Sequence, residues 1–224
     1  MRKAKYLLLV SVLFIIGFIG WTAAVCYLDV QPIGVNGSNV GLSGINAYFH
    51  NVIGVNIFMY TLTDWLGLIP IMLCLAFAFA GMMQLVKRKS FLKVDADILI
   101  LGAFYLVTIM TFLFFEEVVI NYRPVLIEGV AESSYPSSTT MLSLCVTLTS
   151  MHQFYHRIQS VKLRNTTIGL SGSFGVFMVI VRLISGVHWF SDIIGGILLS
   201  CSLFAVYLTA IELSLRREQK QSKS

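Results

Sequence analysis

The chain has 224 residues, of which 57% are hydrophobic and only 12% are charged, and its mean hydropathy is +0.82. A soluble domain typically carries about 25% charged residues. The composition therefore excludes an ordinary soluble domain and indicates an integral membrane protein. The net charge is +5 and the pI is near 9.1, so a nucleic-acid partner has to be considered as well.

The positions of the basic residues decide against a nucleic-acid partner. All but two of the 16 lysines and arginines fall in four clusters: Arg2, Lys3, Lys5; Lys87, Arg88, Lys89, Lys93; Arg157, Lys162, Arg164; and Arg216, Arg217, Lys220, Lys223. With six spans and both termini on one side, all four clusters share one face of the membrane, as the positive-inside rule requires of the cytoplasm. We therefore expect a multi-pass protein of the cell membrane with both termini cytoplasmic.

Six apolar runs are long enough to cross a hydrocarbon core of about 30 Å, which takes roughly 20 helical residues. They lie at about 6–26, 65–85, 97–118, 139–155, 166–185 and 190–212. The sequence thus predicts an all-α polytopic membrane protein whose six transmembrane helices form one bundle and one domain over residues 1–224. Residues 213–224 are expected to be a basic cytoplasmic tail, whose last part, RREQKQSKS at 216–224, is expected to be solvated and disordered.

The first run follows the basic stretch MRKAK and so resembles a secretory signal. Its apolar part of about 20 residues exceeds the roughly 7 to 15 of a signal h-region, and no clear small-x-small cleavage site closes it. We expect this run to be retained as a helix.

Residues 27–64 separate the first two runs and predict an outer loop followed by an interfacial helix. QPIGVNGSN is rich in turn residues, and the segment after it is weakly apolar with polar interruptions. His50 lies in this segment and is expected to be solvated or hydrogen-bonded, without a catalytic role.

The sequence predicts neither a metal site nor a cofactor. His152 and His156 are four residues apart, a spacing that some metal sites use, but no carboxylate lies between them, and an interfacial pair is the preferred interpretation. Neither a CxxC pair nor a metal-ligand spacing is formed by the four cysteines, Cys26, Cys74, Cys145 and Cys201. The cysteines are expected to be small apolar fillers.

The two basic residues outside the clusters, Arg123 and Arg182, fall on the opposite, acidic face, where topology does not explain them. Three polar segments lie at the membrane boundary on this same face: EEVVINYRP, ESSYPSSTT and VRLISGVHWFSD. Because they share one side of the membrane, these segments can converge in a six-helix bundle.

The segment VRLISGVHWFSD contains a histidine, an aspartate and one of the two arginines. His188 and Asp192 are four residues apart, so on a helix the carboxylate can accept a hydrogen bond from one imidazole nitrogen and leave the other as a base or nucleophile. Arg182 precedes a Ser-Gly pair and can fold back toward them, and its planar donors match a phosphate or a carboxylate.

The segment ESSYPSSTT predicts the start of a helix at Pro136, followed by hydroxyl groups and first-turn amides at Ser137, Ser138 and Thr139. A helix N-terminus can bind an anion. Alone, these residues also fit a simple cap of a membrane helix. Together with two arginines and a His-Asp pair, they favour a phosphate site.

This set of residues resembles the type 2 phosphatidic acid phosphatase superfamily, which includes bacterial lipid phosphate phosphatases, glucose-6-phosphatase and vanadium haloperoxidases. The signature of that family is Lys-x6-Arg-Pro, Pro-Ser-Gly-His and Ser-Arg-x5-His-x3-Asp, in this order. The third motif is present as Arg182, His188 and Asp192, with Val181 where serine is usual. The resemblance extends over about 65–212.

The first two motifs are kept only in part. Arg123-Pro124 and Pro136-Ser137 match, whereas Glu116 stands at the position of the lysine and Thr139 at that of the histidine. As a glutamate, residue 116 weakens anion binding unless it points away, is protonated or pairs with an arginine, and it can equally be a plain boundary carboxylate. Thr139 cannot replace the histidine as an efficient proton donor to the leaving oxygen.

The resemblance implies that His188 attacks phosphorus and forms a phosphohistidine, while Asp192 orients the ring. The equatorial phosphate oxygens would be held by Arg123, Arg182, Ser137 and the amides near Ser138. No metal is needed for this mechanism. Without a histidine at 139, a diphosphate lipid such as a polyprenyl diphosphate should be a better substrate than a monoester, because its leaving group needs less help from an acid.

The expected function is that of a membrane lipid phosphatase whose site faces the extracytoplasmic side and whose partners are the bilayer and a lipid phosphate. Two alternatives stay open: a phosphotransferase that passes the phosphoryl group to another lipid, and a catalytically silent lipid-binding or transport protein of the same fold. Oligomeric state and the exact lipid cannot be read from the sequence.

Overall fold

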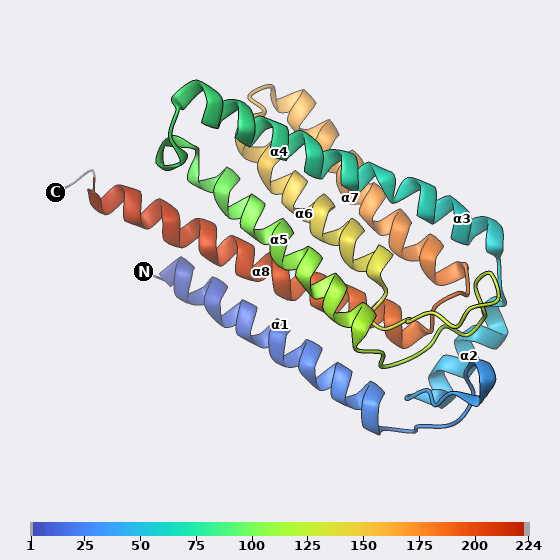
Figure 1. Cartoon of the computed structure of the whole chain (residues 1–224). Coiled ribbons are helices and arrows are strands. Elements are labelled where there is room, and N and C mark those ends of the chain that lie inside the picture. Colours follow the sequence, from blue (N-terminus) through green and yellow to red (C-terminus); the bar gives the residue numbers. More distant parts are fainter. Residues whose placement is uncertain (1, 222–224) are drawn as a thin grey trace.

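A computed structural model describes residues 2–221 of the chain (Figure 1). Its helices are α1 (Arg2–Tyr27), α2 (Ser43–Ile53), α3 (Ile57–Leu66), α4 (Leu68–Arg88), α5 (Ala96–Glu117), α6 (Ser138–Arg157), α7 (Val161–Ile184) and α8 (Phe190–Gln221). Short 3₁₀ turns lie at Val35–Gly37 and Phe91–Lys93. The described residues contain only isolated β-bridges besides these helices, so the predicted all-α fold is confirmed.

Five helical segments among the described residues are long and apolar enough to cross a membrane: α1, the joined α3 and α4, α5, α7 and most of α8. Their outward side chains are largely apolar and exposed, as expected of surfaces that meet lipid. The chain is therefore a multi-pass membrane protein.

The sixth long helix, α6, is too polar to count among these five segments. It packs against α4, α5, α7 and α8, and many of its serines and threonines are buried. Thr147 and Thr149 satisfy their hydroxyls by donating to backbone carbonyls one turn earlier, at 2.8 and 2.7 Å. A helix enclosed by other helices meets protein instead of lipid, so it can carry hydroxyl groups that would be costly on the outside.

Two predicted boundaries differ from the structure. The second span was expected at about 65, but helix begins at Ile57, and α3 continues into α4 with a break only at Gly67. Asp64, which directly precedes the predicted start, lies within α3 and is paired with Arg182. The segment predicted as a loop and an interfacial helix contains α2 and α3, of which only α2 is separate from a span.

The predicted disordered tail also differs, because α8 extends to Gln221. Glu212 stabilises this extension by pairing with Arg216 one turn later, at 2.9 Å, and with Lys3 of α1, at 3.2 Å. Residues 222–224 of the predicted tail lie outside the described residues.

The start of α1 and the end of α8 lie at the same end of the molecule (Figure 1). The α5–α6 loop, the α7–α8 loop and α2 lie at the opposite end. This arrangement gathers the three polar segments singled out in the sequence at one end of the helices.

The α7–α8 loop rests directly on the α2–α3 loop. The amide of Asn56 donates to the carbonyl of Ser185 at 2.9 Å. Gly186 has a φ of +65°, and a Cβ there would overlap the carbonyl oxygen of Gly54. Only glycine combines this left-handed backbone with so close an approach.

Gly186→Ala is therefore expected to loosen the loop that carries the candidate site. The left-handed backbone alone costs about 1 to 2 kcal/mol with a side chain, and the overlap with Gly54 adds to it. Thermal unfolding of the purified protein should show a lower midpoint. Gly169→Ala is a matched control, because no atom lies within 4 Å of a Cβ at this helical glycine of α7; equal midpoints for the two variants would contradict the prediction.

Candidate active site

Two extended parts of the α5–α6 loop lie side by side and bring several polar residues to one place. The amide of Arg123 donates to the carbonyl of Glu132 at 3.1 Å, and the amide of Ser134 donates to the carbonyl of Asn121 at 2.9 Å. These bonds hold the EEVVINYRP and ESSYPSSTT segments together, as the sequence led us to expect.

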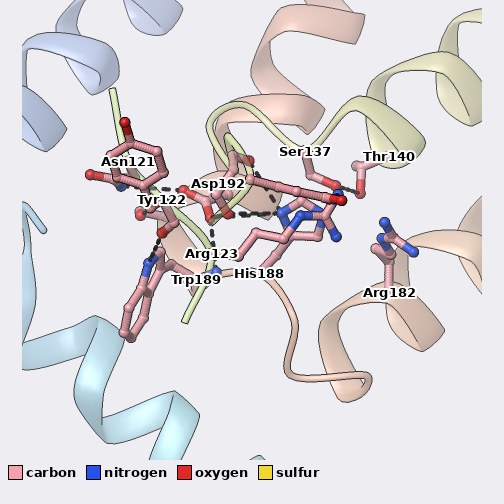
Figure 2. A network of polar contacts seen from close by, with 12 residues as sticks. Asn121, Tyr122, Arg123, Ser137, Thr140, Arg182, His188, Trp189 and Asp192 are labelled. Atoms are coloured by element: carbon pink, nitrogen blue, oxygen red, sulfur yellow. Dashed lines mark hydrogen bonds and ion pairs between the residues drawn. The ribbon is translucent and has the colours of Figure 1, made fainter. Parts of the chain in front are cut away.

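Asp192 lies in the first turn of α8 and is fully buried. Its Oδ2 accepts hydrogen bonds from the amide of Trp189, at 2.9 Å, and from the hydroxyl of Ser134, and its Oδ1 accepts from Nδ2 of Asn121 at 3.3 Å (Figure 2). Three donors at a helix N-terminus stabilise a carboxylate in its charged form. Asp192 thus connects the α5–α6 loop to the start of α8.

His188 lies in the α7–α8 loop, and its side chain is 1% exposed. Its Nδ1 is 3.0 Å from the hydroxyl oxygen of Ser134 and 3.2 Å from the carbonyl oxygen of the same residue. The distance from Nδ1 to Oδ2 of Asp192 is 3.8 Å, which is too long for the direct hydrogen bond expected from the sequence. Ser134 lies between the two residues of the pair instead.

The other ring nitrogen of His188, Nε2, is buried and has no hydrogen-bond partner. Burial lowers the pKa of His188 well below its ordinary value of 6.5, and the positive charges of Arg182 and Arg123 lower it further. The imidazole is therefore neutral at physiological pH and can offer a lone pair.

Arg182 is buried in the last turn of α7, where its Nη1 donates to Oγ1 of Thr63 at 3.0 Å and to Oδ1 of Asp64 at 2.9 Å. Its guanidinium carbon lies 4.7 Å from the centre of the Tyr60 ring. All three partners belong to α3. The nitrogen Nε of Arg182 is buried without a partner.

Arg123 also contacts Tyr60, with its guanidinium carbon 5.6 Å from the ring centre. Its Nη2 pairs with Oε2 of Glu132 at 3.1 Å, while Nε and Nη1 are buried without partners. The structure therefore brings both stray arginines to the same aromatic ring, and each retains free donors.

The residues at the start of α6 are less open to a ligand than the sequence suggested. The Ser137 hydroxyl donates to Oγ1 of Thr140 at 3.1 Å, and the Ser137 amide donates to the carbonyl of Asp192 at 3.0 Å. Both polar groups of Ser137 are thus engaged within the protein. Ser138 and Thr139 are partly exposed, and both line a cavity that Asp64 also lines.

Glu116, at the end of α5, pairs with neither arginine. Its Oε2 accepts from the hydroxyl of Ser133 at 3.2 Å, and the residue lines a narrow cleft together with His188 and Ser138. The structure thus does not contain the pairing with Arg123 or Arg182, one of the interpretations that the sequence left open.

Several residues of the site were not singled out from the sequence. They are Tyr60, Thr63 and Asp64 of α3, together with Asn121 and Ser134 of the α5–α6 loop. Asp64 carried a usable signal, because an ionisable residue at the edge of an apolar run usually has a partner and a role. Ser134 carried none, since the sequence does not say which hydroxyl of a serine-rich segment faces a histidine.

The arrangement is suited to attack on an anionic centre: a neutral imidazole with an unpartnered nitrogen lies among guanidinium groups that have unpartnered donors. Among residues 2–221, no group of three or more histidine, cysteine, aspartate or glutamate side chains is placed to hold a metal ion.

Comparison with known proteins identifies a similar fold. No curated protein matches the chain. A solved structure, that of "the first transmembrane PAP2 type phosphatidylglycerolphosphate phosphatase from Bacillus subtilis", is similar with a TM-score of 0.63, and the match covers 90% of this chain and 96% of that one. The two sequences are 18% identical, so this likeness concerns the fold alone.

The PAP2 superfamily profile matches residues 98–215, which is more than half of the chain. The matched region contains Arg123, Arg182, His188 and Asp192, the residues on which the resemblance was based. The chain belongs to the PAP2 superfamily, and the family resemblance read from the sequence is confirmed.

Proposed function

We propose that this protein is an integral membrane phosphatase that hydrolyses a lipid phosphate or diphosphate through a phosphohistidine at His188. One observation carries the proposal: Nε2 of His188, Nε and Nη1 of Arg123, and Nε of Arg182 are all buried without hydrogen-bond partners. Unpartnered buried polar groups are costly. At one site, the guanidinium donors are suited to hold an anion, and an imidazole nitrogen with a lone pair is suited to attack it.

In the first step, Nε2 of His188 attacks phosphorus. The N–P bond forms while the bond from phosphorus to the leaving oxygen breaks, and that oxygen takes up a proton from solvent. Water then attacks phosphorus, the electron pair of the N–P bond returns to Nε2, and phosphate leaves while water's proton passes to solvent. Arg123 and Arg182 would stabilise the charge on the equatorial oxygens, the main task of a protein in phosphoryl transfer.

The cavities beside the site support a lipid substrate. A cavity of about 550 Å³ is lined at one end by Asp64, Ser138 and Thr139 and continues along apolar side chains of α4 and α5, among them Leu75 and Ile109. An acyl or prenyl chain in this cavity would place its phosphate near the arginines while it stays at bilayer depth.

For the orientation in the membrane, the proposal places the site on the extracytoplasmic side and both termini in the cytoplasm. The basic clusters support it, because they lie near the end of the bundle that holds the termini. With α6 as a sixth crossing, the two termini fall on one side, and the chain forms one membrane domain.

A catalytically silent binding or transport protein remains the rival, and one observation favours it. Both arginines are already paired with carboxylates, Arg182 with Asp64 and Arg123 with Glu132. A site whose charges are balanced internally does not need an anion, so activity has to be measured.

Purified protein in detergent, with chelator present, is expected to release inorganic phosphate from at least one member of a panel of lipid monophosphates and diphosphates. His188→Ala should lose this release completely, because the nucleophile is gone, while inserting and purifying like the wild type. Transfer of phosphate to an added lipid without free phosphate would identify a phosphotransferase. No turnover by a well-folded wild type would favour the silent rival.

A lipid diphosphate is expected to be hydrolysed faster than its monophosphate, by roughly the 10²- to 10⁴-fold that a general acid contributes to a poor leaving group. Thr139 cannot supply that acid, but Glu116 lies in the cleft beside His188. Glu116→Gln therefore serves as the control. A monophosphate preference in the wild type that disappears in Glu116→Gln would show that Glu116 is the acid and that the expected preference is wrong.

The histidine should remain neutral below pH 6.5, where an ordinary histidine is mostly protonated. Burial and the two arginines depress the folded-state pKa of His188, so its nucleophilic form is present above that lowered pKa and is lost only as the pH falls through it. An NMR titration of the ring nitrogens measures this directly. Arg182→Gln removes one of the positive charges that lower the pKa of His188, so the titration midpoint of the ring should shift upward. A wild-type titration midpoint at 6.5 would contradict the prediction.

A further inference from the structure

We propose that Ser134 is a positioning residue whose hydroxyl links the Asp192 carboxylate to the His188 ring by hydrogen bonds. This link fixes the ring so that Nε2 carries the reactive lone pair. The inference deepens the proposed function and rests on it for its catalytic part. It replaces the direct contact between histidine and aspartate, expected from the sequence, with a relay from His188 through Ser134 to Asp192.

The distances require Ser134 as the intermediate. Nδ1 of His188 is 3.8 Å from Oδ2 of Asp192 but 3.0 Å from the hydroxyl oxygen of Ser134. The same hydroxyl donates a hydrogen bond to Oδ2 of Asp192. All three side chains are buried, so bulk water does not compete for these bonds.

Counting protons then fixes the tautomer. The hydroxyl of Ser134 has one proton, and the Asp192 carboxylate can only accept it, so the bond between Ser134 and His188 must use a proton on Nδ1. The carbonyl oxygen of Ser134 lies 3.2 Å from Nδ1 and also can only accept. Both oxygens of Ser134 therefore accept a hydrogen bond from Nδ1, so the ring proton is on Nδ1 and Nε2 keeps its lone pair.

Ser134 is itself held rigidly in this position. It is 1% exposed, and its amide donates to the carbonyl of Asn121 at 2.9 Å. The side chain of Asn121 in turn donates to Oδ1 of Asp192. Serine, aspartate and asparagine thus form a closed set of hydrogen bonds, which restricts rotation of the Ser134 hydroxyl.

The relay matters most when the ring becomes charged. As Nε2 bonds to phosphorus and the bond to the leaving oxygen breaks, Nδ1 keeps its proton and the imidazole gains positive charge. Ser134 accepts a stronger hydrogen bond from that N–H and passes the polarisation to the Asp192 carboxylate. The charge is stabilised without moving a proton onto the aspartate.

The first test is the tautomer of His188 in the wild-type protein, read from ¹⁵N-histidine NMR, in which protonated and unprotonated ring nitrogens have widely separated shifts. His188→Ala identifies the signal among the four histidines of the chain. A proton on Nδ1 is the expected result. A proton on Nε2 would overturn the proposal, and neither result depends on enzymatic activity.

The second test compares variants. Ser134→Ala is expected to lower kcat for phosphate release by about 10- to 100-fold, as loss of a supporting hydrogen bond commonly does. It is also expected to change the ¹⁵N shifts of the His188 ring nitrogens, which report the tautomer. Ser134→Thr keeps the hydroxyl and should restore much of both. Ser202→Ala is the matched control, because Ser202 is a buried serine of α8 whose hydroxyl donates only to the carbonyl of Leu198, at 2.7 Å.

The two failures are distinguishable. If wild-type protein releases no phosphate, the proposed function fails, whereas the tautomer in wild type and Ser134→Ala still decides the relay. If Ser134→Ala folds, keeps the wild-type kcat and keeps the proton on Nδ1, Ser134 only fills space and the relay is wrong.

Discussion

A fully buried carboxylate, that of Asp192, joins two parts of the chain that are far apart in the sequence, the α5–α6 loop and the start of α8. Removing such a group from water costs several kcal/mol unless hydrogen bonds compensate for the loss. The compensation comes from the α5–α6 loop, through Asn121 and Ser134, and from the amide of Trp189 at the start of α8. Because these hydrogen bonds compensate for the burial of one carboxylate, they hold the α5–α6 loop and the α7–α8 loop together. The position of His188 follows from the positions of these two loops.

The two arginines impose a second constraint on the same end of the bundle. A buried guanidinium needs a negative charge nearby and acceptors for its N–H groups. Helix α3 supplies both to Arg182, because Asp64 and Thr63 accept its hydrogen bonds and the ring of Tyr60 packs against it. These contacts hold α3 against α7. The helix itself begins at Ile57, directly after Asn56, whose side chain accepts a hydrogen bond from the amide of Met59 at 3.1 Å.

The sequence was sufficient for features that depend on residue type and spacing along the chain. The all-α membrane fold and the family followed from apolar runs and from motif residues such as Arg182, His188 and Asp192. Contacts between distant segments could not be read in this way. Ser134 meets Asp192 58 positions away, and Arg182 meets Asp64 118 positions away, so neither the relay nor the ion pair leaves a local pattern. The engagement of Ser137 by Asp192 and Thr140 was hidden for the same reason.

The charges of the site bear on how a phosphate would be held. Asp64 and Glu132 already occupy one nitrogen of each arginine, and Glu116 replaces a lysine of the family pattern. Under the proposed function, a phosphate would have to use the remaining guanidinium donors or displace these carboxylates, and either route reduces the affinity for a free anion. A lipid chain that moves from the bilayer into the apolar cavity beside Ser138 and Thr139 gains little hydrophobic free energy, because lipid is as apolar as the cavity wall. Its anchoring in the bilayer would instead hold the attached phosphate at the depth of the arginines, while the balanced arginines would let the inorganic phosphate product, which has no such anchor, dissociate.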